Sequence, residues 1–319
     1  MSPRSLAVGV GLCAALAGAL LAAQAAPDAK PAAPAIEVLD DGFKAVLAPG
    51  AAVRKLESGL KFVEGPVWLD QAKCLLFSDI PADAIYRWEE GKGRSVFRQP
   101  SHNSNGNAVD REGRLLTCEH GSRSVTRTEK DGKVVTLAAL YKAKKLNSPN
   151  DIVAKGDGTI WFTDPPYGID PKAMEQPASC VYRLDADAKE PVAVVTDMSR
   201  PNGLCFSPDE KLLYVGDSGP LHHVRRFRVK ADNTLEGGDV FVVVAPGVPD
   251  GIRMDKEGRL YSTAADGVHV FSPEGKPLGT FKTPETAANC AFGGKDHKTL
   301  FITASTGLYA VDLAVSGAK

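Results

Sequence analysis

The chain has 319 residues, which is enough to bury a large hydrophobic core. Its 38 Lys and Arg residues nearly balance 39 Asp and Glu residues, for a net charge of −1. This balance provides no electrostatic basis for binding nucleic acid or an anionic membrane surface, so we expect neither as a partner. The 31 Gly and 22 Pro residues are typical of a protein with many turns.

Residues 1–26 are predicted to form a secretory signal peptide. One early cation, Arg4, precedes an apolar run of small residues, and the small-x-small sequence Ala23-Gln24-Ala25 follows it. This pattern predicts a periplasmic or secreted protein with no stable membrane insertion after cleavage. A retained membrane anchor is the alternative, although the run is short and lacks a charged stop. Residues 27–35 are predicted to form an Ala/Pro-rich spacer.

Five cysteines follow the predicted cleavage site: Cys74, Cys118, Cys180, Cys205 and Cys290. An odd number cannot pair completely within one chain, and the absence of Cys-x-x-Cys spacing gives no indication of a zinc knuckle or a redox motif. We expect most of them to be small buried hydrophobic residues. One disulfide is compatible with the sequence, which does not identify the pair.

The segment 36–319 repeats one phrase. It consists of a polar residue usually followed by Gly, a short apolar strand, a turn with Asp or Gly, and a second apolar strand. The copies read VEGPVWLDQAKCLLFSD, SNGNAVDREGRLLTCE, SPNDIVAKGDGTIWFTD, RPNGLCFSPDEKLLYVGD, VPDGIRMDKEGRLYSTA and AANCAFGGKDHKTLFITA. Their starting points are roughly 40–50 residues apart, which is the spacing of propeller blades.

Each copy predicts a β-hairpin, because segments such as LLYVGD are strand-like and the turns between them have Asp and Gly chemistry. A third strand follows each copy, and a fourth follows most copies, so each unit predicts a four-stranded blade. The sequence therefore predicts an all-β, six-bladed β-propeller. The last copy ends after its third strand, and we expect a strand from the mature N-terminus, around residues 44–58, to close the ring. An open solenoid or two sandwiches are the alternatives.

The residue before the first strand of every copy carries a side-chain oxygen. These positions are Glu64, Asn105, Asn150, Asn202, Asp250 and Asn289. Pseudo-symmetry is expected to place them in one ring at the mouth of the central channel. Two carboxylates and four amides suit one hard divalent cation, Ca²⁺ first, with Mg²⁺, Mn²⁺ or Zn²⁺ as alternatives. The other interpretation is that Asn and Asp only favour these turn positions.

Three further features are candidates for function. Acidic residues recur at the end of the second strand, of which Asp164 and Asp217 are the better functional candidates; a bond to turn backbone is the alternative role. His120 is expected on the same face, where it could move protons or act as a structural residue. The 164–179 segment is a long loop, which is expected to be a lid or a packed surface loop.

Several phrases resemble the gluconolactonase/regucalcin family, and most closely its bacterial gluconolactonase-like branch: FVEGPVW, LNSPNDIVAKGDGTIWFTDPPYGI, RPNGLCFSPDEKLLYVGDS and VPDGIRMDKEGRLY. The resemblance covers essentially the whole chain after about residue 40. It implies a six-bladed propeller with one divalent metal bound by Glu64, Asn202 and Asp250. It also implies that Asn150 ligates the metal or contacts substrate, and that Asp250 is the catalytic acid/base. Animal members carry Arg where this chain has Ser148.

The leading hypothesis is metal-dependent hydrolysis of a sugar lactone, an aldonolactone such as glucono-1,5-lactone. Asp250 would be the acid/base, and the substrate contacts would be Asn150, Asn105, His120 and Asp217. One alternative is a broad lactonase or phosphotriesterase-like hydrolase. Another is a non-catalytic ligand-binding propeller with a structural metal. The particular lactone, the physiological metal and the oligomeric state are not determined by the sequence.

Overall fold

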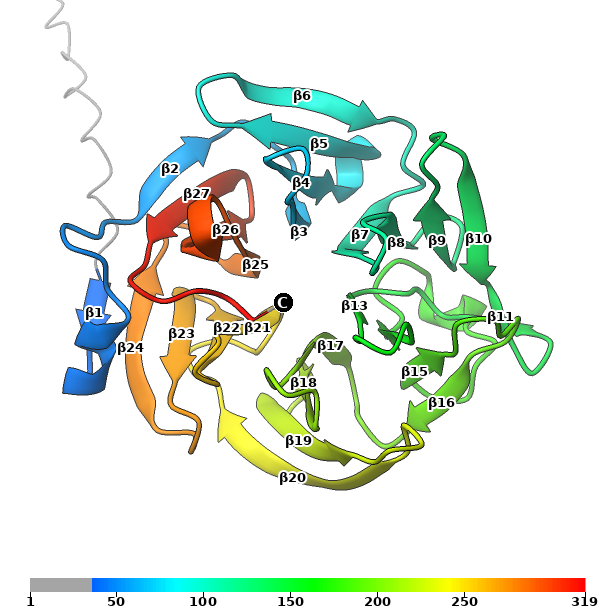
Figure 1. Cartoon of the computed structure of the whole chain (residues 1–319). Helices are drawn as coiled ribbons and strands as arrows, with labels where there is room; N and C mark the ends of the chain where they lie inside the picture. The colour runs from blue at the N-terminus through cyan, green and yellow to red at the C-terminus, as the bar shows by residue number, and fades with distance from the viewer. Residues whose placement is uncertain (1–35, 319) are drawn as a thin grey trace, which may run out of the picture. The chain divides into compact units, whose positions relative to one another are not determined.

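Six antiparallel sheets surround a central axis in the computed structural model, which describes residues 36–318 (Figure 1). This arrangement confirms the predicted all-β, six-bladed propeller. The predicted signal peptide (1–26) and spacer (27–35) lie outside the described residues. None of the helices in the described part of the chain has the length and apolar composition needed to cross a bilayer.

The strands of each blade follow one another along the chain from the axis outward. The innermost strands are β3 (Val63–Leu69), β7 (Ser104–Val109), β13 (Ile152–Ala154), β17 (Pro201–Phe206), β21 (Ile252–Met254) and β25 (Ala287–Gly293). The second strands are β4 (Cys74–Asp79), β8 (Leu115–Glu119), β14 (Ile160–Asp164), β18 (Leu212–Asp217), β22 (Leu260–Ala264) and β26 (Thr299–Ala304). The third strands are β5 (Ala84–Glu89), β9 (Ser124–Thr128), β15 (Cys180–Leu184), β19 (His223–Val229), β23 (Gly267–Phe271) and β27 (Gly307–Asp312).

The outer strands come from two parts of the chain. Five follow their own blades: β6 (Gly93–Arg98), β10 (Val134–Ala138), β16 (Val192–Val195), β20 (Leu235–Val243) and β24 (Pro277–Lys282). The outer strand of the sixth blade is β2 (Arg54–Glu57), which lies within the 44–58 segment and pairs antiparallel with β27. Each inner strand contacts the next around the ring, and β25 contacts β3.

The short remaining elements of the described chain lie near the N-terminus, between blades and in the connections within blades. A hairpin of β11 (Leu140–Tyr141) and β12 (Lys144–Lys145) connects the second and third blades. Four 3-10 turns are η1 (Asp41–Ala45), η2 (Ile80–Ala82), η3 (Pro171–Ala173) and η4 (Lys295–His297). The repeat did not predict β1 (Ile36–Val38), which adds a fifth strand to the fifth blade by pairing with β24. This strand lies upstream of the first copy, so the pattern contained no signal for it.

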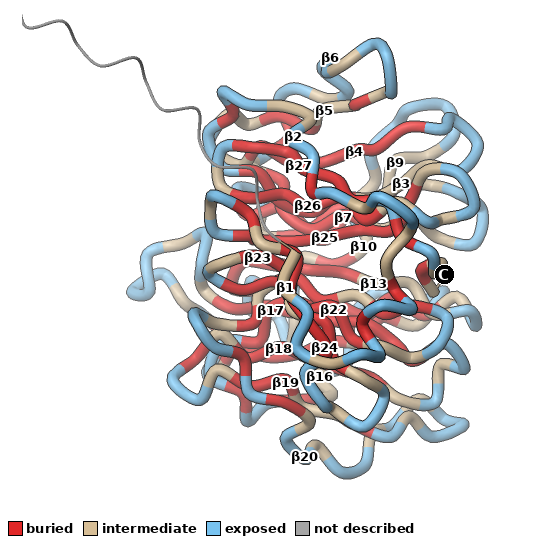
Figure 2. Tube along the Cα trace, turned by 90° about the vertical axis from the view of Figure 1, so that its left-hand side faces the viewer, coloured by how far each residue is buried: buried red, intermediate tan, exposed pale blue. Residues whose placement is uncertain are grey.

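The hydrophobic core is divided among the six interfaces between neighbouring blades. Each interface contains one cluster of buried apolar side chains. Trp68 stacks on Phe301 between the first and sixth blades, with ring centroids 5.6 Å apart. Figure 2 shows that buried residues lie on the strands that cross the interior, whereas exposed residues lie on the connecting turns. All five described cysteines are free and buried, as expected for small hydrophobic residues, and no two of them form a disulfide.

The glycine in the repeated phrase marks a close approach between blades. An added Cβ at Gly65, Gly106, Gly203 or Gly251 would lie 2.0–2.5 Å from an atom of the next blade. At Gly203 the nearest atom is the carbonyl oxygen of Asp250, 2.2 Å away, to which the Gly203 amide also donates a hydrogen bond of 3.0 Å. The inner strands are therefore too close together at this level to accept a side chain.

We expect Gly203→Ala to lower the free energy of unfolding by about 1–3 kcal/mol, because the added methyl group must push β17 away from the fifth blade. The matched control is Gly216→Ala in β18, where the added Cβ would lie 3.3 Å from the nearest atom, Cβ of Pro249. Thermal and urea unfolding of both variants measures the difference. Equal effects of the two substitutions would contradict this explanation of the repeat.

Candidate metal and active site

Three amides of the predicted ring form a hydrogen-bonded chain across the second, third and fourth blades. Asn105 Nδ2 donates to Asn150 Oδ1 at 2.6 Å, and Asn150 Nδ2 donates to Asn202 Oδ1 at 2.5 Å. Asn202 Nδ2 then donates to Ser218 Oγ at 3.0 Å. The three asparagines are buried. Residues that lie far apart in the sequence are thus brought together by the propeller, as the repeat predicts.

The two carboxylates of the ring lie close enough to affect each other's ionisation. Burial raises the pKa of Asp250, and the nearby charges of Glu64 and Asp151 raise it further. Burial also raises the pKa of Glu64, which accepts a 2.7 Å hydrogen bond from the Gly65 amide. A hydrogen bond with Asn202 lowers the pKa of Asp250 and partly opposes this rise. A hydrogen bond with Asn289 does the same for the pKa of Glu64. The channel mouth therefore concentrates negative charge in a place that water solvates poorly.

The donor set fits a hard divalent cation. Oδ1 of Asp250 is buried and has no hydrogen-bond partner within residues 36–318. An unpaired carboxylate oxygen beside a second buried carboxylate is costly unless a cation offsets it. The described residues contain no group of three or more His, Cys, Asp and Glu side chains placed to hold a metal. Any ion here would therefore depend on the amide oxygens as well, which suits oxygen-preferring cations.

His120 borders the amide chain as a neutral imidazole. Burial lowers the pKa of His120 to about 4, so the ring is uncharged at neutral pH. Its Nε2 lies 3.2 Å from Asn105 Nδ2. The Asn105 amide has two N–H groups, which match His120 and Asn150 as acceptors. This geometry places His120 next to the ring, as expected, and orients the amide of Asn105.

Asp164 and Asp217, the two strand-end carboxylates singled out by the sequence, accept their hydrogen bonds from backbone amides. Both carboxylate oxygens of Asp164 accept 2.7 Å bonds, from the amides of Asn147 and Ser148. Asp217 accepts bonds of 2.8–2.9 Å from the amides of Ser199, Arg200 and Gly219. Each carboxylate thus holds the loop that leads to the ring residue of its own blade. We therefore leave Asp217 out of the candidate substrate contacts and assign Asp164 the same structural role.

The 164–179 segment connects β14 to β15 and contributes a residue that the sequence analysis missed, Tyr167. The Gly168 amide donates a 3.0 Å hydrogen bond to Oγ of Ser148. Ser148 is the residue for which the family resemblance implies Arg in animal members. The Arg200 guanidinium lies 5.9 Å from the centroid of the Tyr167 ring. Burial raises the pKa of the Tyr167 hydroxyl, and the negative charge of Asp250 raises it further. Hydrogen bonding with Ser218 and Asn202 lowers this pKa and so opposes the rise. The loop therefore brings an aromatic hydroxyl beside the ring.

An ion pair between the half-buried Arg253 and the buried Asp151 lies just beyond the ring and was also missed. Arg253 Nη1 donates to Asp151 Oδ2 at 3.1 Å, which links the fifth blade to the third. The repeat contained a signal for both residues. Asp151 stands where four copies have Gly, and Arg253 stands where the other copies have an uncharged residue. The two positions at which one copy differs in charge from the other copies are thus the two partners of this ion pair.

The fold and the ring define a propeller with a channel mouth lined by carboxylate and amide oxygens. The chain belongs to the SMP-30/gluconolactonase/LRE-like family, whose model matches residues 62–306. A gluconolactonase of Zymomonas mobilis is 32% identical over 290 residues, which cover 82% of this chain and 81% of that protein. A pentonolactonase of Haloferax volcanii is 26% identical over 262 residues, which cover 80% of this chain and 85% of that protein.

A solved structure supports the same relationship. The gluconolactonase of Xanthomonas campestris matches with a TM-score of 0.83 and 36% sequence identity, and the match covers 90% of this chain and 99% of that chain. These comparisons confirm the resemblance inferred from the repeated phrases.

Asp217→Asn is expected to lower the free energy of unfolding by about 1–3 kcal/mol, because an amide cannot accept all three backbone bonds as the carboxylate does. The exposed turn residue Asp131, which accepts one bond from the Lys133 amide, gives the control Asp131→Asn. Urea unfolding of the two variants measures the difference. A fully stable Asp217→Asn protein would show that the loop does not depend on this carboxylate.

Proposed function

We propose that this protein is a metal-dependent lactonase that hydrolyses a sugar lactone, an aldonolactone such as glucono-1,5-lactone. The lactonase class is supported by family membership and by relatives of similar length that are named gluconolactonase and pentonolactonase. The observation that carries the proposal is the unpaired, buried Oδ1 of Asp250 beside Glu64 and a chain of amides. The predicted signal peptide would place the activity in the periplasm or outside the cell.

Glu64, Asn202 and Asp250 would hold the divalent cation, with Asn150 as a fourth ligand or as a contact to substrate. Ca²⁺ is the first candidate because all the donors are oxygens; Mg²⁺, Mn²⁺ and Zn²⁺ are the alternatives. When bound, such an ion polarises the ester carbonyl and makes a nearby water molecule more acidic.

The chain's own residues would carry the proton and position the sugar. Asp250 would accept a proton from the attacking water and return it to the ring oxygen as the ester bond breaks, which leaves an open-chain hydroxy acid. The bond from water oxygen to the carbonyl carbon forms, and the bond from that carbon to the ring oxygen breaks. Asn105, whose amide is held by His120, lies beside Asn150 and would contact sugar hydroxyls. Tyr167 would cover the bound substrate.

We expect Asp250→Asn to reduce kcat/KM for glucono-1,5-lactone by about 10²–10⁴-fold, because the acid/base is lost and a charged ligand is removed. Asp131→Asn is again the matched control and should keep full activity. Proton release in a pH-stat assay measures turnover, with aliphatic lactones and an organophosphate as comparison substrates. Full activity of Asp250→Asn would remove this residue from the mechanism. Equal turnover of all substrate classes would favour a broad hydrolase.

Metal binding is tested by stability, without reference to turnover. Adding Ca²⁺ to chelator-treated protein at a hundredfold excess over its Kd should raise the free energy of unfolding by about 2.7 kcal/mol. Glu64→Gln and Asp250→Asn should each lose most of this gain, because each removes one of the two charges that attract the ion. Stabilisation of the wild type without turnover of any lactone would instead favour a binding propeller with a structural metal.

A further inference from the structure

A cavity lies at the end of the inner strands that is remote from the ring residues. The ring residues stand at or just before the start of these strands, whereas this cavity is lined by residues from their later part and from the turns that follow. Its volume is about 700 Å³, which lies in the range of small-molecule sites. The ring and this cavity therefore occupy opposite ends of the central channel.

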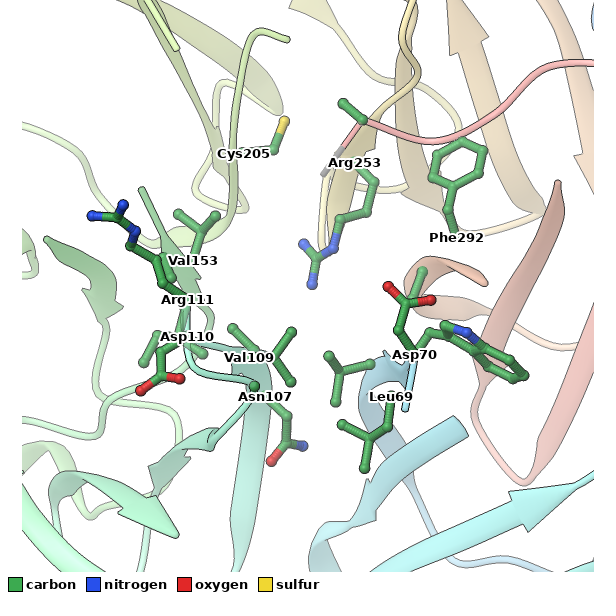
Figure 3. A pocket seen from close by; sticks show the side chains of 18 of the residues that line it. Leu69, Asp70, Asn107, Val109, Asp110, Arg111, Val153, Cys205, Arg253 and Phe292 are labelled. Carbon is green, nitrogen blue, oxygen red and sulfur yellow. The ribbon is translucent and has the colours of Figure 1, made fainter. Parts of the chain in front are cut away.

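The cavity walls combine an apolar patch with charged side chains. They include Val67, Leu69, Val109, Val153, Phe206 and Phe292, and Figure 3 shows Leu69, Val109, Val153 and Phe292 around the opening. Charged residues such as Asp70, Asp110 and Arg111 also line it. An apolar patch beside placed charged groups suits a small organic molecule that has an apolar body and one charged group.

Arg253 projects its guanidinium into this cavity (Figure 3). Its Nη1 is occupied, because it donates to Asp151 Oδ2 at 3.1 Å and to the Ile252 carbonyl oxygen at 2.7 Å. Nε and Nη2 have no hydrogen-bond partner among residues 36–318. These two nitrogens form one side of the planar group, the edge that holds a carboxylate by two parallel hydrogen bonds.

The charges around Arg253 limit the ligand to a single negative charge. The guanidinium remains cationic at any physiological pH, but Asp151 already offsets much of its charge. Apart from Arg253, the acidic residues of the wall outnumber the basic ones, so the wall disfavours a second negative charge: Asp70, Asp110, Glu112 and Glu210 against Arg111 and Lys155. A monocarboxylate matches the free edge in shape and charge, and the apolar walls match a hydrocarbon or aromatic body.

We propose that this cavity is a second binding site, separate from the ring, for a small organic monocarboxylate with an apolar body. The carboxylate binds to the Nε and Nη2 edge of Arg253. The body packs against Val109, Val153 and Phe292. The site needs neither a metal nor lactone hydrolysis, so it stands independently of the proposed function.

The test uses benzoate and its neutral analogue benzamide as probes, with chelator-treated full-length protein. Isothermal titration calorimetry measures binding, and tryptophan fluorescence provides a second readout because Trp68 lines the cavity. Benzoate should bind at least about tenfold more tightly than benzamide, since only the anion forms charge-assisted bonds with Arg253. Equal affinities, or no benzoate binding up to its solubility limit, would overturn the proposal.

Variants locate the site. The double substitution Arg253→Met and Asp151→Asn removes both charges, so that neither is left buried alone, and should weaken benzoate binding on the order of tenfold or more. Arg94→Met, at an exposed position on β6, is the control and should not change it. Asp250→Asn should also bind benzoate normally. Unchanged binding in the double variant, or loss of binding in Asp250→Asn, would place benzoate elsewhere and overturn the proposal.

If the double variant does not fold, a crystal structure of the wild-type protein with benzoate decides the question. Density with the carboxylate on the free edge of Arg253 supports the site. Benzoate bound only at other positions overturns it.

Discussion

The close approach of the six inner strands is the constraint on which the rest of the structure depends. Glycine lets the backbones pack together, so that the Gly106 amide donates to the Asn150 carbonyl at 2.8 Å and the Gly203 amide donates to the Asp250 carbonyl at 3.0 Å. Thr163 Oγ1 adds a 2.8 Å bond to the Asn202 carbonyl from the neighbouring blade. These bonds fix the backbone of the ring residues themselves. Their side chains therefore converge with little freedom, which is the condition for a preorganised binding site.

That convergence has an electrostatic cost. Asp151 raises the pKa of both Glu64 and Asp250, so three carboxylates share one poorly solvated region. The chain offsets part of this charge through Arg253, which pairs with Asp151 from the fifth blade, two blades further around the ring. The amides of Asn105, Asn150 and Asn202 supply acceptors without further charge. The remaining imbalance lies at Glu64 and Asp250, where a divalent cation would have its greatest effect.

Much of the fold and of the ring could be predicted because both are periodic. A repeated turn and strand pattern identifies blades, and the residue at one phase of the pattern must occupy the same level in each blade. The Tyr167 loop and β1 have no counterpart in the other copies, so periodicity could not place them. The backbone partners of Asp217 depend on how the loop before β17 folds back toward the end of β18. The spacing of residues in the repeat contains no information about that loop conformation. Arg253 and Asp151 were visible only as departures from the pattern, and their pairing required the geometry of the ring.

The position of a residue along its inner strand also explains why the two ends of the channel differ chemically. The six inner strands are equivalent elements of a repeated blade, so a residue's position in its strand sets its level in the channel. The strand starts supply side-chain oxygens, while the later positions supply mainly valine, leucine and phenylalanine. The pair of Asp151 and Arg253 spans the channel between these levels. A sugar lactone would therefore enter and leave at the ring end, beside Tyr167, because a polar substrate gains nothing by crossing an ion pair into an apolar cavity.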